Sequence, residues 1–400
     1  MRRTLACLAS LALSALLGSH CNNEQTGSTP NEDLGTADPD LSGGDSPDLS
    51  GGGGQPDMTT PPVGTPSRFV VVRIGTGGTA ALNNDATATF LETRQIGDGA
   101  LVGNALAMPV AASGSNRPLT LSGLASVEGQ LSRSSDGRYL ILAGYAAAPG
   151  AKDISTSSSA TYNRVIGRID AAGNINTATA STAFTAAAVR GATSSDGSML
   201  WVSSDSGIGY TTLNSTAVPT LLAGDNVRAI GIFGSGASAQ LFVSSSAGSN
   251  LGVNRVGTGL PTTVGTSVTR LPGFTDSNSP ASVGFVVLDR DSNGMPDQIY
   301  VADTRPIGGG VQRFRFNGTT WLLEGTITTG ANSGGRYLDG FVSNGTVTIL
   351  VSTAEMNDTI ATRVLRLTDA GGSTSAVNVQ LVTTAANNTT YRGVALAPNP

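Results

Sequence analysis

The sequence predicts an all-β fold, and two observations lead to this prediction. Short runs of apolar and β-branched residues alternate with turn residues, as in Tyr139–Leu142 and Thr346–Val351. The composition agrees, because 13% of the residues are charged and 53 of the 400 are glycine, which suits short strands joined by tight turns. After residue 66, no apolar pattern with a helical period continues over a dozen positions.

The strand-like runs recur in repeating units. Ser-Asp-Gly turns mark two of these units, at Ser135–Gly137 and Ser195–Gly197, because a tight hairpin turn needs the positive φ that glycine and aspartate tolerate. The units begin at intervals of roughly 40–60 residues, which is the period of propeller blades. We therefore predict a single β-propeller of about six blades, with seven possible because the segment 83–120 is ambiguous. The predicted blade starts lie near Val127, Arg190, Arg228, Val283, Tyr337 and Arg392.

The last strand-like run, Arg392–Ala397, has no partner after it in the chain. We expect it to pair with the strand that begins at Phe69, which would close the ring through the two ends of the domain. The chain then divides into a signal peptide (1–20), a tether (21–66) and the propeller domain (67–400). The tether is acidic and rich in Pro, Gly, Ser and Asp, so it cannot bury enough apolar surface to offset chain entropy, and we expect it to be disordered.

The N-terminus has the features of an export signal. Arg2 and Arg3 precede an apolar stretch that is too short to cross a bilayer as a helix. The residues around Cys21 resemble the lipobox of bacterial lipoproteins, in which the signal peptidase cleaves before a lipid-bearing cysteine, although His20 stands where that motif has a small residue. The resemblance implies a lipid anchor at Cys21 as the only membrane attachment, on the outer membrane or cell surface. Export to the periplasm or medium without a lipid is the alternative.

Several chemistries are excluded by composition. Cleavage before Cys21 would remove His20, the single histidine, and so would exclude histidine-dependent triads, histidine-ligated zinc and histidine general bases. Lys152 is the single lysine, so a lysine-rich surface for nucleic acid is missing and no nucleic-acid partner is expected. The spacing of the carboxylates singles out no pair, which leaves carboxylate-based hydrolysis open.

The sharpest motif in the chain begins at Asp289. Side-chain oxygens occur at loop positions that can converge on Ca²⁺, and the backbone carbonyl of Met295 could supply a further ligand. The pattern resembles the hairpin loop of FG-GAP propellers such as integrin α subunits, which bind Ca²⁺ between strands. This resemblance implies a structural calcium site with Asp289, Asp291, Asn293 and Asp297 as side-chain ligands. A plain Asp/Asn/Gly turn is the alternative.

The Ser-Asp-Gly-x-x-Leu turns resemble those of YVTN and WD40-like blades, and residues 67–400 are similar to secreted bacterial propellers. The fold implies a rigid disc whose loops can bind a partner. We therefore expect a monomeric, non-enzymatic binding or scaffold module for a protein or glycan ligand. The alternative is a secreted hydrolase or lactonase-like enzyme with a carboxylate and calcium site at the central channel. Three or more converging carboxylates would favour the enzyme, and a lining of Ser, Thr and Gly would favour the binding module.

Overall fold

The computed structural model describes residues 64–356 and 361–400, all within the unit Thr60–Pro400. The predicted signal peptide, Cys21 and nearly all of the predicted tether lie outside these residues. In the described ranges the chain is almost entirely β-structure, and no helix there is long and apolar enough to cross a membrane. The helices are single 3₁₀ turns: η1 (Ile154–Thr156), η2 (Gly236–Ser238), η3 (Gly248–Asn250) and η4 (Thr374–Ala376).

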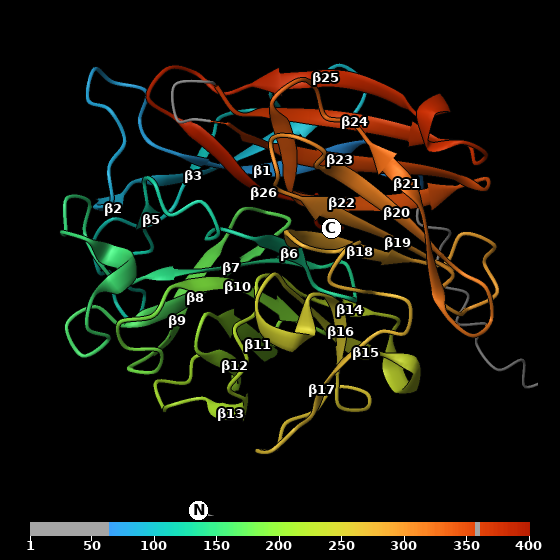
Figure 1. Ribbon diagram of the computed structural model, residues 1–400. Coiled ribbons are helices and arrows are strands. Elements are labelled where there is room, and N and C mark those ends of the chain that lie inside the picture. Colours follow the sequence, from blue (N-terminus) through green and yellow to red (C-terminus); the bar gives the residue numbers. More distant parts are fainter. Residues whose placement is uncertain (1–63, 357–360) are drawn as a thin grey trace, which may run out of the picture. The chain divides into compact units, whose positions relative to one another are not determined.

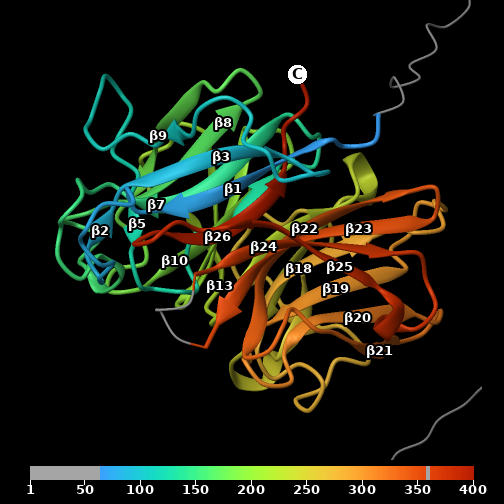
Figure 2. The ribbon, with the colours of Figure 1, turned by 90° about the horizontal axis from the view of Figure 1, so that it is seen from above.

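The strands form six four-stranded antiparallel sheets, arranged as the blades of a six-bladed propeller (Figures 1 and 2). In five of the sheets the strands follow one another in chain order from the innermost to the outermost. These strands are β6 (Leu131–Arg133), β7 (Tyr139–Tyr145), β8 (Arg164–Asp170) and β9 (Ile175–Ser181); β10 (Val189–Ser194), β11 (Met199–Ser204), β12 (Gly207–Thr212) and β13 (Thr220–Ala223); β14 (Ile230–Phe233), β15 (Gln240–Ser245), β16 (Gly252–Val256) and β17 (Val268–Arg270); β18 (Ser282–Leu288), β19 (Gln298–Asp303), β20 (Gly310–Phe316) and β21 (Trp321–Ile327); β22 (Ser333–Ser343), β23 (Thr346–Glu355), β24 (Arg363–Asp369) and β25 (Asn378–Thr384).

The sixth sheet closes the ring, as the sequence predicts. Its order is β26-β1-β3-β4, so the last strand of the chain is its innermost strand and pairs with the first, as Figure 2 shows for red β26 beside blue β1. Phe69 pairs with Leu396 and Val70 with Ala395. The bounds are β26 (Thr390–Leu396), β1 (Arg68–Ile74), β3 (Thr89–Gln95) and β4 (Leu106–Ala107), and a separate two-stranded sheet joins β2 (Ala86–Thr87) to β5 (Leu121–Ser122).

The predicted blade starts all mark innermost strands. Val127 lies just before β6, and the other five predicted starts fall within or next to β10, β14, β18, β22 and β26. The ambiguous segment 83–120 adds strands to the closing sheet and the small β2–β5 sheet, so the described residues form six blades. Neighbouring inner strands lie side by side around a central channel.

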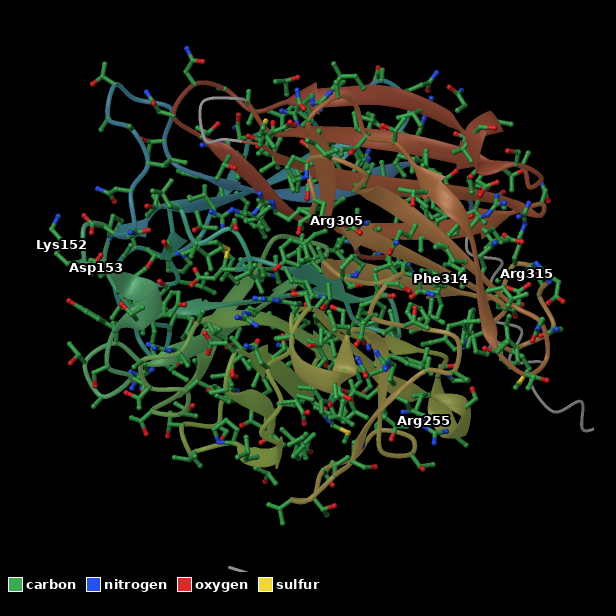
Figure 3. All side chains as sticks on the ribbon, viewed as in Figure 1. Lys152, Asp153, Arg255, Arg305, Phe314 and Arg315 are labelled. Atoms are coloured by element: carbon green, nitrogen blue, oxygen red, sulfur yellow. The ribbon has the colours of Figure 1, made fainter. Side chains whose placement is uncertain are left out.

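Apolar packing lies between neighbouring blades. Trp201 on β11 is fully buried against Ile230 and Val243 of the next sheet, and its indole donates a hydrogen bond to the carbonyl of Pro261 at 2.7 Å. Burying one such large side chain contributes about 1.5–3 kcal/mol. Lys152 lies at the periphery, where it forms a 2.7 Å ion pair with Asp85 (Figure 3). The blades therefore form a packed ring whose inner strands can present side chains to the channel.

Candidate functional site

A cavity of about 410 Å³ occupies the end of the channel where the inner strands finish. It is lined by residues of five inner strands, β6, β10, β14, β18 and β22, together with Phe242 of β15 and the loops that follow some of the inner strands. The cavity therefore exists only when most of the ring has assembled, because five of the six blades each supply a part of its wall.

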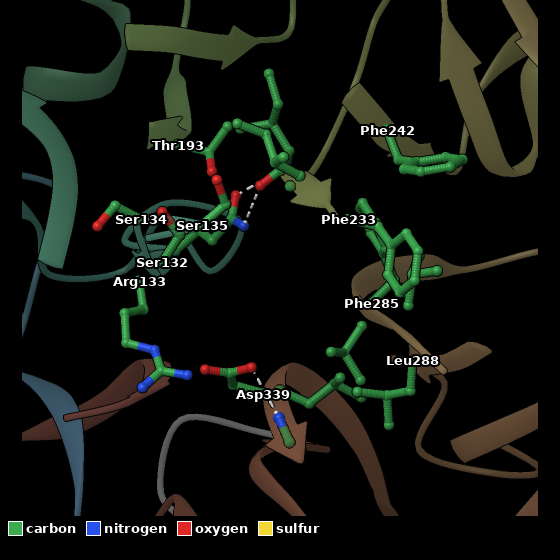
Figure 4. A pocket seen from close by; sticks show the side chains of 18 of the residues that line it. Ser132, Arg133, Ser134, Ser135, Thr193, Phe233, Phe242, Phe285, Leu288 and Asp339 are labelled. Atoms are coloured by element: carbon green, nitrogen blue, oxygen red, sulfur yellow. Dashed lines mark hydrogen bonds between the residues drawn. The ribbon is translucent and has the colours of Figure 1, made fainter. Parts of the chain in front are cut away.

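The two sides of the cavity differ in chemistry. Phe233, Phe242 and Phe285 form an apolar wall, and Figure 4 shows them across the cavity from the β6 residues Ser132 and Arg133. The opposite wall carries the hydroxyl of Thr193 and the guanidinium of Arg133. An apolar wall combined with a few placed polar groups is typical of sites for small molecules.

Arg133 on β6 and Asp339 on β22 face one another across the polar part of the cavity (Figure 4). The Asp339 carboxylate accepts backbone N–H groups from Gly340 and Leu396, each at 2.8 Å. Burial raises the pKa of Asp339, and the positive charge of Arg133 opposes this rise. Arg133 donates a 3.4 Å hydrogen bond to the carbonyl of Ala397. The ion pairs in the described part of the chain include neither Arg133 nor Asp339.

Two buried side chains, Gln130 and Tyr337, close the channel beyond the cavity, and we call them the channel plug. Tyr337 packs against Ala229 and Val283 of two other blades, and its hydroxyl donates a hydrogen bond to the carbonyl of Val127. The Gln130 amide forms two hydrogen bonds with the backbone of Ile230, at 2.7 and 2.9 Å. The cavity is therefore blind at its inner end.

Four arginines lie beyond the channel plug, around Tyr337. Three of them stand where an extra residue interrupts the pairing of an inner strand, which is the pattern of a β-bulge that redirects a side chain. Arg392 donates to the carbonyl of Gly123 at 2.9 Å, and Arg336 donates to the carbonyl of Ser126, so both hold the segment that precedes β6. The four residues are Arg190, Arg228, Arg336 and Arg392.

Glu128 is a fully buried carboxyl within this same segment. It accepts hydrogen bonds from the hydroxyl of Tyr145 and from the backbone N–H of Ser122. Burial raises the pKa of Glu128 to about 7, although Tyr145 and the charges of Arg392 and Arg164 oppose the rise. Burial also lowers the pKa of Arg190 to about 10. Glu128 and the four arginines stabilise the closed end of the channel and do not line the cavity.

The predicted calcium loop connects β18 to β19 and does not line the cavity. The carboxylates of Asp289 and Asp291 accept the backbone N–H of Asn293 at 3.1 and 3.2 Å, and Asn293 in turn accepts the N–H of Met295 at 2.8 Å. Asp297, at the far end of the loop, accepts the N–H of the residue after Asp289. Within residues 64–356 and 361–400, no group of three acidic, cysteine or histidine side chains is placed to hold a metal. Calcium binding by this loop stays a prediction.

The sequence places a site at the central channel only in the hydrolase alternative, and none of the site residues predicted from it lines this cavity. Its described lining holds one carboxylate, Asp339, and one guanidinium, Arg133, among Gln130 and serine, threonine, glycine and apolar residues. This lining lacks the three converging carboxylates expected of the enzyme alternative, and it is more apolar than the Ser, Thr and Gly lining expected of the binding module. A carboxylate inside the strand-like run that begins at Tyr337 is the signal that could have identified Asp339.

Comparison with known proteins yields similarity of fold alone. No known protein family matches the chain, and no curated protein matches it. Among solved structures, TolB from Acinetobacter baumannii is 14% identical with a TM-score of 0.45, over 83% of this chain and 67% of that one. A putative TolB from Agrobacterium tumefaciens is 13% identical with a TM-score of 0.41, over 84% of this chain and 99% of that one. A glucose dehydrogenase is 11% identical with a TM-score of 0.43, over 75% of this chain and 96% of that one. Because these TM-scores are below 0.5, no conclusion about function rests on them.

Proposed function

We propose that this chain is an exported, non-enzymatic binding module, and that its ligand occupies the blind cavity of the propeller channel. The observation that carries the proposal is the cavity itself, with an apolar wall of three phenylalanines opposite a polar wall that holds one cation and one carboxylate. Its volume of about 410 Å³ falls within the range of sites for small ligands or for the end of a larger one.

The chemistry of the lining supports binding over hydrolysis. Glycosidases use two carboxyl groups about 5–10 Å apart, and the described lining contains one. Ser132 lines the cavity, but its hydroxyl donates a 2.7 Å hydrogen bond to the carbonyl of Ala192. A serine nucleophile needs an adjacent base to take its proton, and Ser132 is instead bonded to an amide oxygen that is not basic.

The N-terminal sequence supports export and a lipid anchor at Cys21, which would hold a monomeric propeller near a membrane surface. The test is detergent-phase partitioning of the expressed protein. We expect the unmodified chain to enter the detergent phase and Cys21→Ser to stay in the aqueous phase. Equal partitioning of the two would contradict the anchor and leave export to be tested separately by cell fractionation.

The proposed site is tested with the uncharged fluorescent probe N-phenyl-1-naphthylamine, whose apolar rings match the apolar wall. We expect the probe to bind the folded protein, and Phe285→Ala to weaken its affinity by about fivefold or more because the variant removes part of the apolar wall. Val264→Ala is the matched control, since Val264 is an exposed apolar residue that does not line the cavity.

Circular dichroism establishes that both variants are folded. If neither Phe285→Ala nor Val264→Ala changes the affinity of the probe, the cavity is not its binding site.

A further inference from the structure

The charges inside the cavity indicate the class of ligand that it accepts. We infer that the cavity binds a small zwitterion with an aromatic side chain, of the α-amino acid class; this inference rests on the proposed binding function. Three features carry it: a cation, a carboxylate on a different inner strand, and an apolar wall beside both.

The cation is available to a ligand carboxylate. Arg133 has five N–H donors in a planar arrangement that matches a carboxylate, and among the described residues it donates one long hydrogen bond, of 3.4 Å, to the carbonyl of Ala397. The guanidinium points from β6 into the cavity and toward Asp339 on β22 (Figure 4). A ligand carboxylate at this position would gain charge-assisted hydrogen bonds that replace those made by water.

The carboxylate is available to a ligand ammonium. Each oxygen of Asp339 accepts one backbone N–H, from Gly340 or Leu396, and a carboxylate oxygen can accept a further hydrogen bond. Ionised Asp339 is unfavourable in this half-buried position because it has lost part of its hydration. An ammonium group bound beside it would offset that cost.

The two charges together select against singly charged ligands. An anion attracted by Arg133 is repelled by Asp339, and an amine attracted by Asp339 is repelled by Arg133. A zwitterion satisfies both residues at once, and its side chain can then lie against the apolar wall formed by Phe233, Phe242 and Phe285. The channel plug behind the cavity limits the depth of the site, which suits a compact ligand.

The test compares three ligands by isothermal titration calorimetry on the folded protein. L-Phenylalanine carries both charges, N-acetyl-L-phenylalanine lacks the ammonium, and phenethylamine lacks the carboxylate. We expect L-phenylalanine to bind at least about tenfold more tightly than either analogue, since each analogue loses one charge-assisted contact. Equal affinity of the three ligands, or no binding of L-phenylalanine at millimolar concentration, would overturn the inference.

Matched variants assign the contacts. Arg133→Gln should weaken L-phenylalanine by about tenfold or more and leave phenethylamine unchanged or tighter, because this ligand has no carboxylate to lose. Asp339→Asn should weaken L-phenylalanine and leave N-acetyl-L-phenylalanine unchanged or tighter. Arg138→Gln, on the exposed β6–β7 turn, is the control for removal of one positive charge and should alter none of the three affinities. If Asp339→Asn fails to fold because its backbone contacts are lost, the Arg133 variant still decides the question.

Failure of this inference is distinguishable from failure of the proposed function. If the fluorescent probe binds and Phe285→Ala weakens it, but the three phenylalanine compounds bind equally, the cavity is a binding site with a different ligand class. If the probe is also insensitive to Phe285→Ala, the proposed binding site is itself wrong.

Discussion

Glu128 shows how one residue couples the closed end of the channel to pH. Its carboxyl is fully buried, and burial raises its pKa from 4.5 to about 7. A carboxyl whose pKa is raised on folding binds its proton more strongly in the folded state, so it contributes stability at low pH. This contribution is complete below about pH 4.5 and is lost as the pH rises through about 7.

We expect Glu128→Gln to remove this pH dependence. Between about pH 4.5 and 8 the unfolding free energy of the unmodified protein should fall by about 3 kcal/mol more than that of the variant, because a shift of one pKa unit corresponds to about 1.4 kcal/mol. Glutamine loses one of the two hydrogen bonds of Glu128, so a constant offset of about 1 kcal/mol is also expected. Denaturant titrations at three pH values measure the difference. Parallel profiles for the two proteins would show that Glu128 does not titrate in this range.

The residues of the cavity show why the site was harder to predict than the fold. Arg133 and Asp339 are about two hundred positions apart in the sequence, and each stands alone among apolar or small neighbours. No spacing rule connects them, since they meet only because two blades contribute to one channel. The metal ligands predicted from the sequence lie instead in one local loop, where a motif can be recognised without knowledge of the fold.

At the scale of the element, the inner strands were predictable because turn chemistry and strand chemistry agree. The two Ser-Asp-Gly turns join β6 to β7 and β10 to β11, with Gly137 and Gly197 at positive φ. The interruptions in the inner strands were not predictable, because a β-bulge depends on how a strand pairs and twists within its sheet. These bulges orient three of the arginines around Tyr337, so neither the bulges nor the closed end of the channel was predicted from the sequence.

Gly393 tests how tightly the closing strand is packed. It lies in β26, and its N–H donates to the carbonyl of Gly129 at 2.9 Å. A Cβ atom added here would lie 2.2 Å from the backbone nitrogen of Leu131. Gly393→Ala should therefore destabilise the fold by about 2–3 kcal/mol, because the obstructing atoms are backbone and cannot rotate away.

Gly97→Ala is the matched control for this prediction, since an added Cβ there has no neighbour within 4 Å. Chemical denaturation measures both variants. Equal stability of the two would mean that the contact between β26 and the segment before β6 is looser than described.

The loop between β18 and β19 carries a second prediction at this scale. Adding Ca²⁺ to a chelator-treated protein should raise its melting temperature by about 2–4 °C, which corresponds to about 1 kcal/mol of stabilisation. Asp289→Ala should abolish the increase, because the motif places this carboxylate first among the proposed ligands. Calorimetric scans with and without Ca²⁺ provide the measurement. If Ca²⁺ does not change the melting temperature of the unmodified protein, the loop is a plain turn.

At the scale of the whole molecule, stability depends on closure of the ring by β26. This strand supplies the innermost position of a sheet whose other strands come from the start of the domain. It also contacts β22 and β6, the inner strands of the two neighbouring sheets. Its loss would leave β1 as an unpaired edge and uncover the buried side chains that pack on it.

We expect a chain ended after Asn388, which lacks β26, to lose more than about 5 kcal/mol of stability, a loss comparable to the total stability of many domains. Near-ultraviolet circular dichroism follows the packing of Trp201 and Trp321, and size-exclusion chromatography follows aggregation. A truncated chain that unfolds at the same denaturant concentration as the full one would contradict closure as the source of stability.

The channel plug also determines how a guest molecule comes and goes. Because Gln130 and Tyr337 block the inner end of the channel, a ligand must enter and leave the cavity through its one open end. A polymer could therefore insert one end into the cavity but could not pass through the ring. A second protein that bound over this open end would slow the dissociation of a bound ligand and block the entry of a free one, without contacting the residues that bind the ligand.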